Sequence, residues 1–123
     1  MINSLCWNQA ALLTEASNGR FAKAPDVVHV VRCMMTEMEA AASALGATLP
    51  TPMEKRIDMT IRATDHTMSM LQDLKRNRPS EIDVLANSVT AMSRISGVET
   101  PTVTTLIALT KLKGTVRGVH GES

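Results

Sequence analysis

A hydroxyl group and two carboxylates occur in the middle of the sequence at spacings that helices could bring together. Ser69 and Asp73 are four residues apart, which places them on one face of a helix. Glu81 follows Pro79 and Ser80 in the first turn of a second predicted helix, where the helix dipole favours an anion. A hairpin of these helices could point all three side chains into one cleft, although spacing alone favours helix capping and surface charge.

Three potential metal ligands recur every fourth residue of another predicted helix. His29, Cys33 and Glu37 would form a row on one helix face, and these residue types can ligate zinc. Three ligands along one helix span two turns and seldom converge on one ion. We therefore interpret the row, with Arg32 beside it, as the polar face of an amphipathic helix, and we expect no metal site.

Two further patterns contain residue types that are found in catalytic and nucleotide-binding sites. Asp65, His66 and Ser69 supply the groups of a nucleophilic triad, but a serine three residues after a histidine is typical of a helix start, and no oxyanion loop accompanies it. The glycines of residues 114–121 read G-x-x-x-G-x-x-G and follow the last predicted helix. Because neither a strand nor a further helix comes after them, the pattern fits neither a Walker loop nor a Rossmann turn.

The composition excludes several classes of protein. Thirteen basic residues against twelve acidic ones give a net charge of +1, and Trp7 and Phe21 are the aromatic residues, so we expect no nucleic-acid partner. No apolar run approaches the roughly 18 residues of a membrane helix, and the first residues do not resemble a signal peptide. Cys6 and Cys33 form no CxxC motif, so we expect a reduced, cytoplasmic protein with no membrane partner.

Helical periodicity predicts an all-α fold, because apolar residues recur at intervals of three and four along most of the chain. A length of 123 residues suits a single helical domain of about five to seven helices, covering residues 1–113 and followed by a flexible tail, 114–123. The predicted helices run from residue 2 to the Asn18-Gly19 pair, from Asp26 to Gly46, from Glu54 through Ile61, from Met68 to Arg76, from Ser80 to Gly97, and onward from Pro101.

Several of these segments together resemble a known family. Met-Ser-Met-Leu-Gln-Asp-Leu at 68–74, followed by Pro-Ser-Glu-Ile-Asp at 79–83, resembles the "S-S-M-x-Q-D … R-x-T-E-I-D" signature of the C-terminal domain of ketopantoate reductases (2-dehydropantoate 2-reductases). Residues 35–46 are similar to that family's "E-x-x-x-V-A-x-A-x-G" helix, and 97–101 to its "G-V-x-T-P" junction. The resemblance covers about residues 3–113, and its combination of motifs is specific.

The resemblance implies a fold, a reaction and a set of substrate-binding residues. The fold would be similar to the 6-phosphogluconate dehydrogenase C-terminal-like fold. In the family, an N-terminal Rossmann domain holds NADPH, and the helical domain closes over the ketoacid, whose ketone a lysine protonates. The family's serine, aspartate, glutamate and second asparagine fall on Ser69, Asp73, Glu81 and Asn8. Hydroxyl and amide groups can hold a hydroxyl or carboxylate, and a carboxylate can orient an ammonium group.

The sequence also departs from the family's pattern. The first asparagine falls on Ser4, the lysine would precede Met1, and Ala86-Asn87 replaces the Asn-Gly that follows Glu-Ile-Asp in the family. No catalytic residue is therefore assigned here, and the Rossmann half is missing. We expect a stand-alone or truncated substrate-cleft and dimerisation domain, related to NADPH-dependent reduction of 2-dehydropantoate to pantoate in pantothenate biosynthesis. By itself we expect the chain to bind no cofactor and to be inactive.

For this leading hypothesis, the expected partners are a second copy of the chain, a separate Rossmann-domain chain and a small 2-ketoacid or 2-hydroxyacid. Two other functions stay open. The alternative is a non-catalytic helical dimerisation or interaction module. A third hypothesis is a small metal protein that uses His29 and Cys33.

Overall fold

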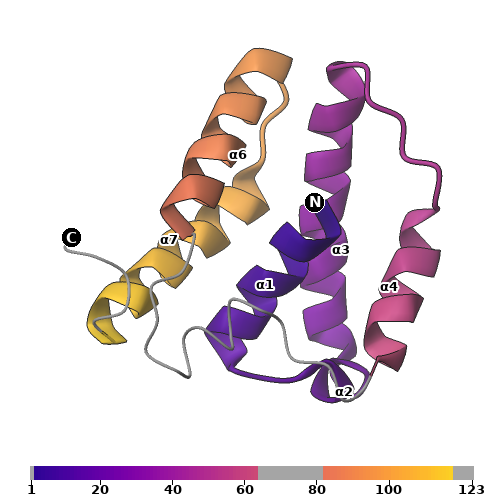
Figure 1. Ribbon diagram of the computed structural model, residues 1–123, viewed down its shortest axis with the longest axis vertical. Helices are drawn as coiled ribbons and strands as arrows, with labels where there is room; N and C mark the ends of the chain where they lie inside the picture. The colour runs from indigo at the N-terminus through magenta and orange to yellow at the C-terminus, as the bar shows by residue number, and fades with distance from the viewer. Residues whose placement is uncertain (1, 64–81, 118–123) are drawn as a thin grey trace.

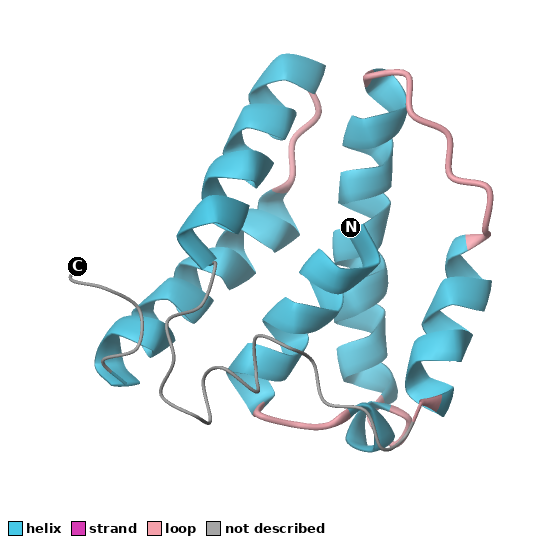
Figure 2. Ribbon diagram, in the orientation of Figure 1, coloured by secondary structure: helices cyan, strands magenta, loops and turns pink. Residues whose placement is uncertain are grey.

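The computed structural model describes residues 2–63 and 82–117 (Figure 1). All regular structure in these two stretches is helical (Figure 2), which confirms the predicted all-α fold. No helix in them is long and apolar enough to cross a membrane. The predicted helix at 68–76 and the predicted helix start at Ser80 lie outside the described residues. The described helices are α1 (Ile2–Thr14), α2 (Asn18–Phe21), α3 (Pro25–Ala44), α4 (Met53–Arg62), α6 (Ile82–Ser96) and α7 (Pro101–Arg117).

Helix α3 is the centre of the domain. It contacts α1, α2, α4, α6 and α7, while α6 and α7 pack against each other as a hairpin. In Figure 1 this hairpin lies on one side of α3 and α4 lies on the other, with α1 crossing α3 between them. Helix α1 also contacts α7 and is therefore enclosed by its neighbours.

Aliphatic side chains, methionines and two aromatic rings form the core of the described residues. Met34, Met35 and Met38 are fully buried on α3, where an unbranched thioether can fill irregular gaps between helices. Trp7 of α1 packs against Phe21 of α2, with ring centroids 5.3 Å apart and a tilt of 46°. The three methionines and the two aromatic rings are among the largest fully buried side chains.

Glycine and proline lie at the ends of the long helices; the start at Pro101 and the ends at Gly46 and Gly97 are as predicted, and α3 begins one residue before the predicted Asp26. Gly46 and Gly97 have positive φ angles of 90° and 73° just after α3 and α6, a conformation that glycine adopts without steric cost. Pro25 and Pro101 are the first residues of α3 and α7, where the missing backbone N–H has no helical partner to lose.

Two predicted boundaries are wrong. Helix α1 ends at Thr14 rather than at Asn18-Gly19, because Glu15 turns the chain with a φ of 56° and α2 then begins at Asn18. The last helix continues to Arg117, so residues 114–117 are helical rather than part of a tail. Gly114 is buried there.

Candidate functional site

Of the four predicted substrate-binding residues, Asn8 lies in the part of the chain that the structure describes. It lies in the middle of α1 with 5% of its surface exposed, and its Nδ2 donates a 2.6 Å hydrogen bond to the backbone oxygen of Ser4, one turn earlier. This bond fixes the orientation of the carboxamide along the helix. Ser69, Asp73 and Glu81 lie outside the described residues, so their convergence with Asn8 stays a prediction.

A polar cluster that the sequence did not predict as functional joins α1, α2 and α4. Nδ2 of Asn18 donates to the backbone oxygen of Thr60 (3.1 Å), and Nδ2 of Asn3 donates to the Thr60 hydroxyl (3.3 Å). Asn18 is 1% exposed, and the Oδ1 atoms of Asn18 and Asn3 are buried without a hydrogen-bond partner in the described part of the chain. Burying a carbonyl oxygen without a hydrogen-bond donor costs free energy of folding, and a ligand's donor group could satisfy these oxygens. This cluster is therefore a candidate binding element.

The turn signal of Asn18-Gly19 explains why this cluster was missed. An asparagine before a glycine commonly ends a helix, so the sequence predicts a helix end at this pair. In the structure Asn18 instead begins α2, and its side chain points to Thr60, 42 residues later. No local pattern could indicate such a distant contact.

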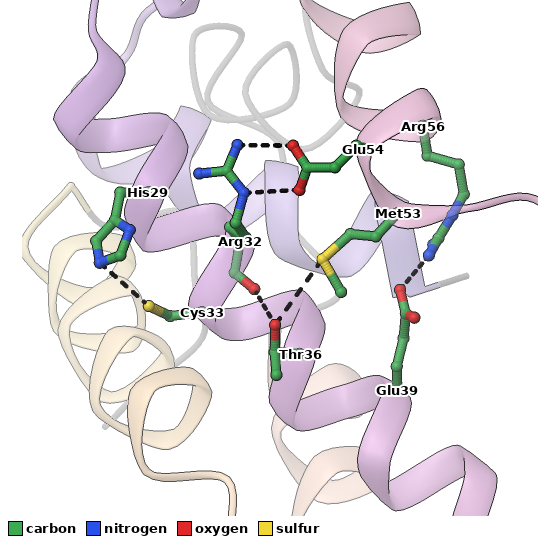
Figure 3. A network of polar contacts seen from close by, with 8 residues as sticks. All are labelled: His29, Arg32, Cys33, Thr36, Glu39, Met53, Glu54 and Arg56. Carbon is green, nitrogen blue, oxygen red and sulfur yellow. Dashed lines mark hydrogen bonds and ion pairs between the residues drawn. The ribbon is translucent and has the colours of Figure 1, made fainter.

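The row of potential metal ligands on α3 divides into two parts. Nε2 of His29 lies 3.6 Å from Sγ of Cys33 (Figure 3). Glu37, the third member, binds elsewhere: its Oε2 accepts a hydrogen bond from the backbone N–H of Thr102, and its Oε1 accepts one from Val103, each at 3.0 Å. Within residues 2–63 and 82–117, no three histidine, cysteine, aspartate or glutamate side chains form a metal-binding group.

Glu37 completes the first turn of α7. Pro101 has no N–H, the N–H groups of Thr102 and Val103 bond to Glu37, and the N–H of Thr104 bonds to the oxygen of Thr100. The donors that a helix start leaves without partners are thus satisfied, and the carboxylate lies at the positive end of the helix dipole. The contact also brings together the α3 segment and the Thr-Pro junction, two of the segments that carry the family resemblance.

Ion pairs fix α4 against α3 on the opposite side (Figure 3). Arg32 donates to Glu54 through Nε (2.8 Å) and Nη2 (3.0 Å), and these hydrogen bonds lower the pKa of the Glu54 carboxyl. Glu39 pairs with Arg56, whose Nε also donates to the backbone oxygen of Thr51 (3.1 Å). The second pair is well shielded, with 22% and 16% of the two side chains exposed, so it fixes the helix angle more firmly than the exposed first pair.

Cys6 and Cys33 lie in different environments. Cys6 is completely buried in the core, and burial raises the pKa of its thiol to about 12. Cys33 is half-buried beside His29. Because the thiolate is the reactive form, thiol chemistry is not expected at Cys6.

Together, the fold and the site define an all-α domain with a buried asparagine on its first helix and a central helix whose glutamate caps the last one. The family model "Ketopantoate reductase PanE/ApbA C terminal" matches residues 1–114. The chain therefore belongs to the ketopantoate reductase family and corresponds to its C-terminal domain.

Individual relatives agree with this assignment. A 2-dehydropantoate 2-reductase from Mesorhizobium japonicum is 32% identical over 117 residues, which are 95% of this chain and 36% of that protein. A crystal structure assigned to a ketopantoate reductase from Ralstonia solanacearum MolK2 superposes with a TM-score of 0.85 at 30% identity, covering 97% of this chain and 36% of the other. A PanE/ApbA family ketopantoate reductase from Ralstonia eutropha JMP134 gives 0.80 at 28% identity, with coverages of 96% and 41%. The chain thus spans little more than a third of these relatives.

Proposed function

We propose that this chain supplies the substrate-binding helical part of an enzyme that reduces 2-dehydropantoate to pantoate with NADPH. The match of residues 1–114 to the C-terminal domain of the family carries the proposal. The position of Asn8 supports it, because a carboxamide held in a fixed orientation within a helix can bind a ketoacid's oxygen atoms without further ordering. Ser69, Asp73 and Glu81 would complete the ligand set.

The described residues do not fit NADPH itself. A dinucleotide site needs a strand, a glycine-rich turn and a helix N-terminus that meets the pyrophosphate. Residues 2–63 and 82–117 contain helices and no strand. In this proposal the nucleotide is bound by a Rossmann domain on another polypeptide segment or chain, and this chain's residues bind and orient the ketoacid. We further propose that the assembled enzyme acts in the cytoplasm.

Calorimetry with ketopantoate and with pantoate tests the substrate site directly. We expect the wild-type chain to bind one of them, and Ser69→Ala and Glu81→Gln to weaken that binding at least tenfold, because each removes a hydrogen bond or charge that the ligand needs. Ser88→Ala and Glu99→Gln are matched controls, since both residues are exposed on the described surface. Binding that is equal in all four variants would contradict the proposed site.

An activity assay tests the division of roles. Purified chain with NADPH and ketopantoate should show no turnover. We then add the separately expressed Rossmann domain of the Mesorhizobium japonicum relative. Turnover in this mixture would show that the helical part is sufficient for substrate binding. NADPH oxidation by this chain alone would overturn the proposal.

A second function, a helical dimerisation module, is favoured by the outer face of α7. Leu109, Leu112 and Val116 lie on one stripe of that helix with 51%, 62% and 78% of their surfaces exposed. We propose that a second copy covers this stripe, since contiguous exposed apolar side chains often mark an interface. Sedimentation should then show a dimer in the wild-type chain and a monomer in Leu112→Glu. A strictly monomeric wild-type chain would exclude the module.

A further inference from the structure

We propose that a second copy of this chain packs on the hairpin of α6 and α7, with a ridge of α7 from each copy seated in a groove between the two helices of the other. This inference rests on the dimerisation module proposed above and deepens it, because it adds the surface of α6 that receives the partner. The hairpin lies on one side of α3, away from α4 (Figure 1).

The groove runs between α6 and α7 and is open to solvent. Small and apolar side chains form most of its walls, with a lysine beyond them: Ala86, Val89, Thr90, Thr104, Ile107, Ala108 and Lys111. The groove encloses about 180 Å³. Since an apolar cavity of roughly 150 Å³ already takes a benzene ring, a leucine side chain has room in this groove.

The threonine hydroxyl groups of the groove have partners within their own helices. Oγ1 of Thr90 donates a 3.0 Å hydrogen bond to the backbone oxygen of Ala86, and Oγ1 of Thr104 lies 3.3 Å from Oγ1 of Thr100. The groove therefore needs no hydrogen bond from a partner. An apolar side chain suits this lining, because it enters without leaving a polar group unpaired.

The outer face of α7 supplies apolar side chains beside the groove. A ridge of four residues at intervals of four, three and four runs along this helix: Thr105, Leu109, Leu112 and Val116. Its three apolar members are each more than half exposed. Ala108 lines the groove and directly precedes Leu109, so ridge and groove lie next to each other. A two-fold axis can then seat each ridge in the other copy's groove, the self-complementary contact of most homodimers.

The charges on α7 favour an antiparallel pair. Residues 101–116 contain no aspartate or glutamate, and Lys111 and Lys113 both lie in the C-terminal half. A parallel pair would bring equal lysines together, whereas an antiparallel pair places this basic half opposite the partner's N-terminal half, which follows Glu99. Nζ of Lys111 lies 3.8 Å from Oδ1 of Asp83 in its own copy, so each groove rim carries charges of both signs. Two identical rims can therefore approach each other.

Substitutions on α6 separate this interface from one made by α7 alone. Thr90 is exposed and lines the groove, but it is not part of the ridge. In sedimentation experiments we expect a dimer for the wild type, and we expect Thr90→Arg to raise the dissociation constant of the dimer at least tenfold, because the charged side chain fills the groove. Ala108→Arg should have the same effect.

Ser88→Arg is the matched control for these variants. Ser88 is exposed on the same helix, and its position two residues before Thr90 directs it to the other side of α6. Ser88→Arg should therefore form a dimer as the wild type does. Circular dichroism verifies that each variant is folded.

Cross-linking tests the direction of the helix pair. Ala108 lies near the middle of the α7 wall of the groove, so the two-fold axis should pass close to it. With Cys33→Ser as background, a short bismaleimide should link Ala108→Cys to its copy. It should not link Val116→Cys, because an antiparallel pair holds these positions about 24 Å apart along the helix axis.

The outcomes distinguish the groove from the dimerisation module itself. A dimer that is lost in Leu112→Glu but kept in folded Thr90→Arg and Ala108→Arg would leave the module standing and overturn the groove. Equal cross-linking at both cysteine positions would overturn the antiparallel pair. A wild-type chain that stays monomeric, or that associates only with an added Rossmann domain, would overturn the module and the groove together.

Discussion

Removing the carboxylate of Glu37 should destabilise the whole domain through a helix that lies 65 residues away in the sequence. Glu37 accepts 3.0 Å hydrogen bonds from the backbone N–H groups of Thr102 and Val103. In Glu37→Ala both donors lose their partner, and the start of α7 loses a negative charge at its positive end. The helix must then bind water at a site that is partly covered by α3.

The expected magnitude follows from these two bonds. A hydrogen bond to a charged group contributes about 1.5–3 kcal/mol when it is buried, and replacing an N-cap costs about 0.5–2 kcal/mol. Because Glu37 is half-buried and water can replace part of the interaction, we expect Glu37→Ala to cost about 2 kcal/mol in total. Glu37→Gln keeps one acceptor oxygen, so we expect about 1 kcal/mol. For a domain of this size each kcal/mol corresponds to roughly 4 °C in Tm.

Urea denaturation followed by circular dichroism at 222 nm measures the free energy of unfolding in each variant. Glu54→Gln is the matched control, since Glu54 also lies in an ion pair with a helix residue but is exposed. We expect the order Glu37→Ala, Glu37→Gln, Glu54→Gln from the largest loss to the smallest. If Glu37→Ala is no less stable than Glu54→Gln, the cap on α7 does not stabilise the domain and the reasoning is refuted.

Two further predictions concern the core. Gln9 is fully buried, and neither its Oε1 nor its Nε2 has a hydrogen-bond partner in the described residues. Gln9→Met should therefore raise the free energy of unfolding, measured by urea denaturation, by about 1–3 kcal/mol. A loss of stability would show that the amide has a partner. Burial raises the pKa of the Cys6 thiol to about 12, above its model-peptide value of 9.0. Between these values the unfolded chain releases the thiol proton and the folded chain keeps it, so stability should fall as pH rises above 9, by up to about 1.4 kcal/mol per unit. Cys6→Ala should lose stability less steeply over that range, and equal slopes would contradict the prediction.

Much of the fold could be predicted because glycine and proline act locally. The ends of α3 and α6 at Gly46 and Gly97 and the start of α7 at Pro101 depend on backbone conformations that residue type alone restricts. The end of α1 was predicted too late because Glu15 adopts a left-handed conformation that glutamate seldom takes. In the structure Lys113 pairs with Glu15 and donates to the backbone oxygen of Leu13, and local propensity gives no sign of these contacts.

The candidate site could be predicted less completely than the fold. Asn8 was found through a resemblance, and its burial agrees with a fixed polar group in the interior. Glu37 was considered as a metal ligand because spacing along one helix shows only which residues share a face. Its true contact depends on how α7 packs against α3, which no pattern within α3 can reveal. The buried Oδ1 of Asn18, which has no hydrogen-bond partner in the described part of the chain, could not be predicted for the same reason.

The cap on α7 also has a consequence for the order of folding. The N-terminal half of the chain is synthesised before α7 and contains α1 and α3, which contact each other. Helix α7 is synthesised after α1 and α3, and its first turn is completed only when it docks on a glutamate made 65 residues earlier. Bringing together residues so far apart in sequence costs loop-closure entropy, so we expect this contact to form after the folding barrier has been crossed. Loss of the Glu37 carboxylate should therefore accelerate unfolding while leaving the refolding rate nearly unchanged.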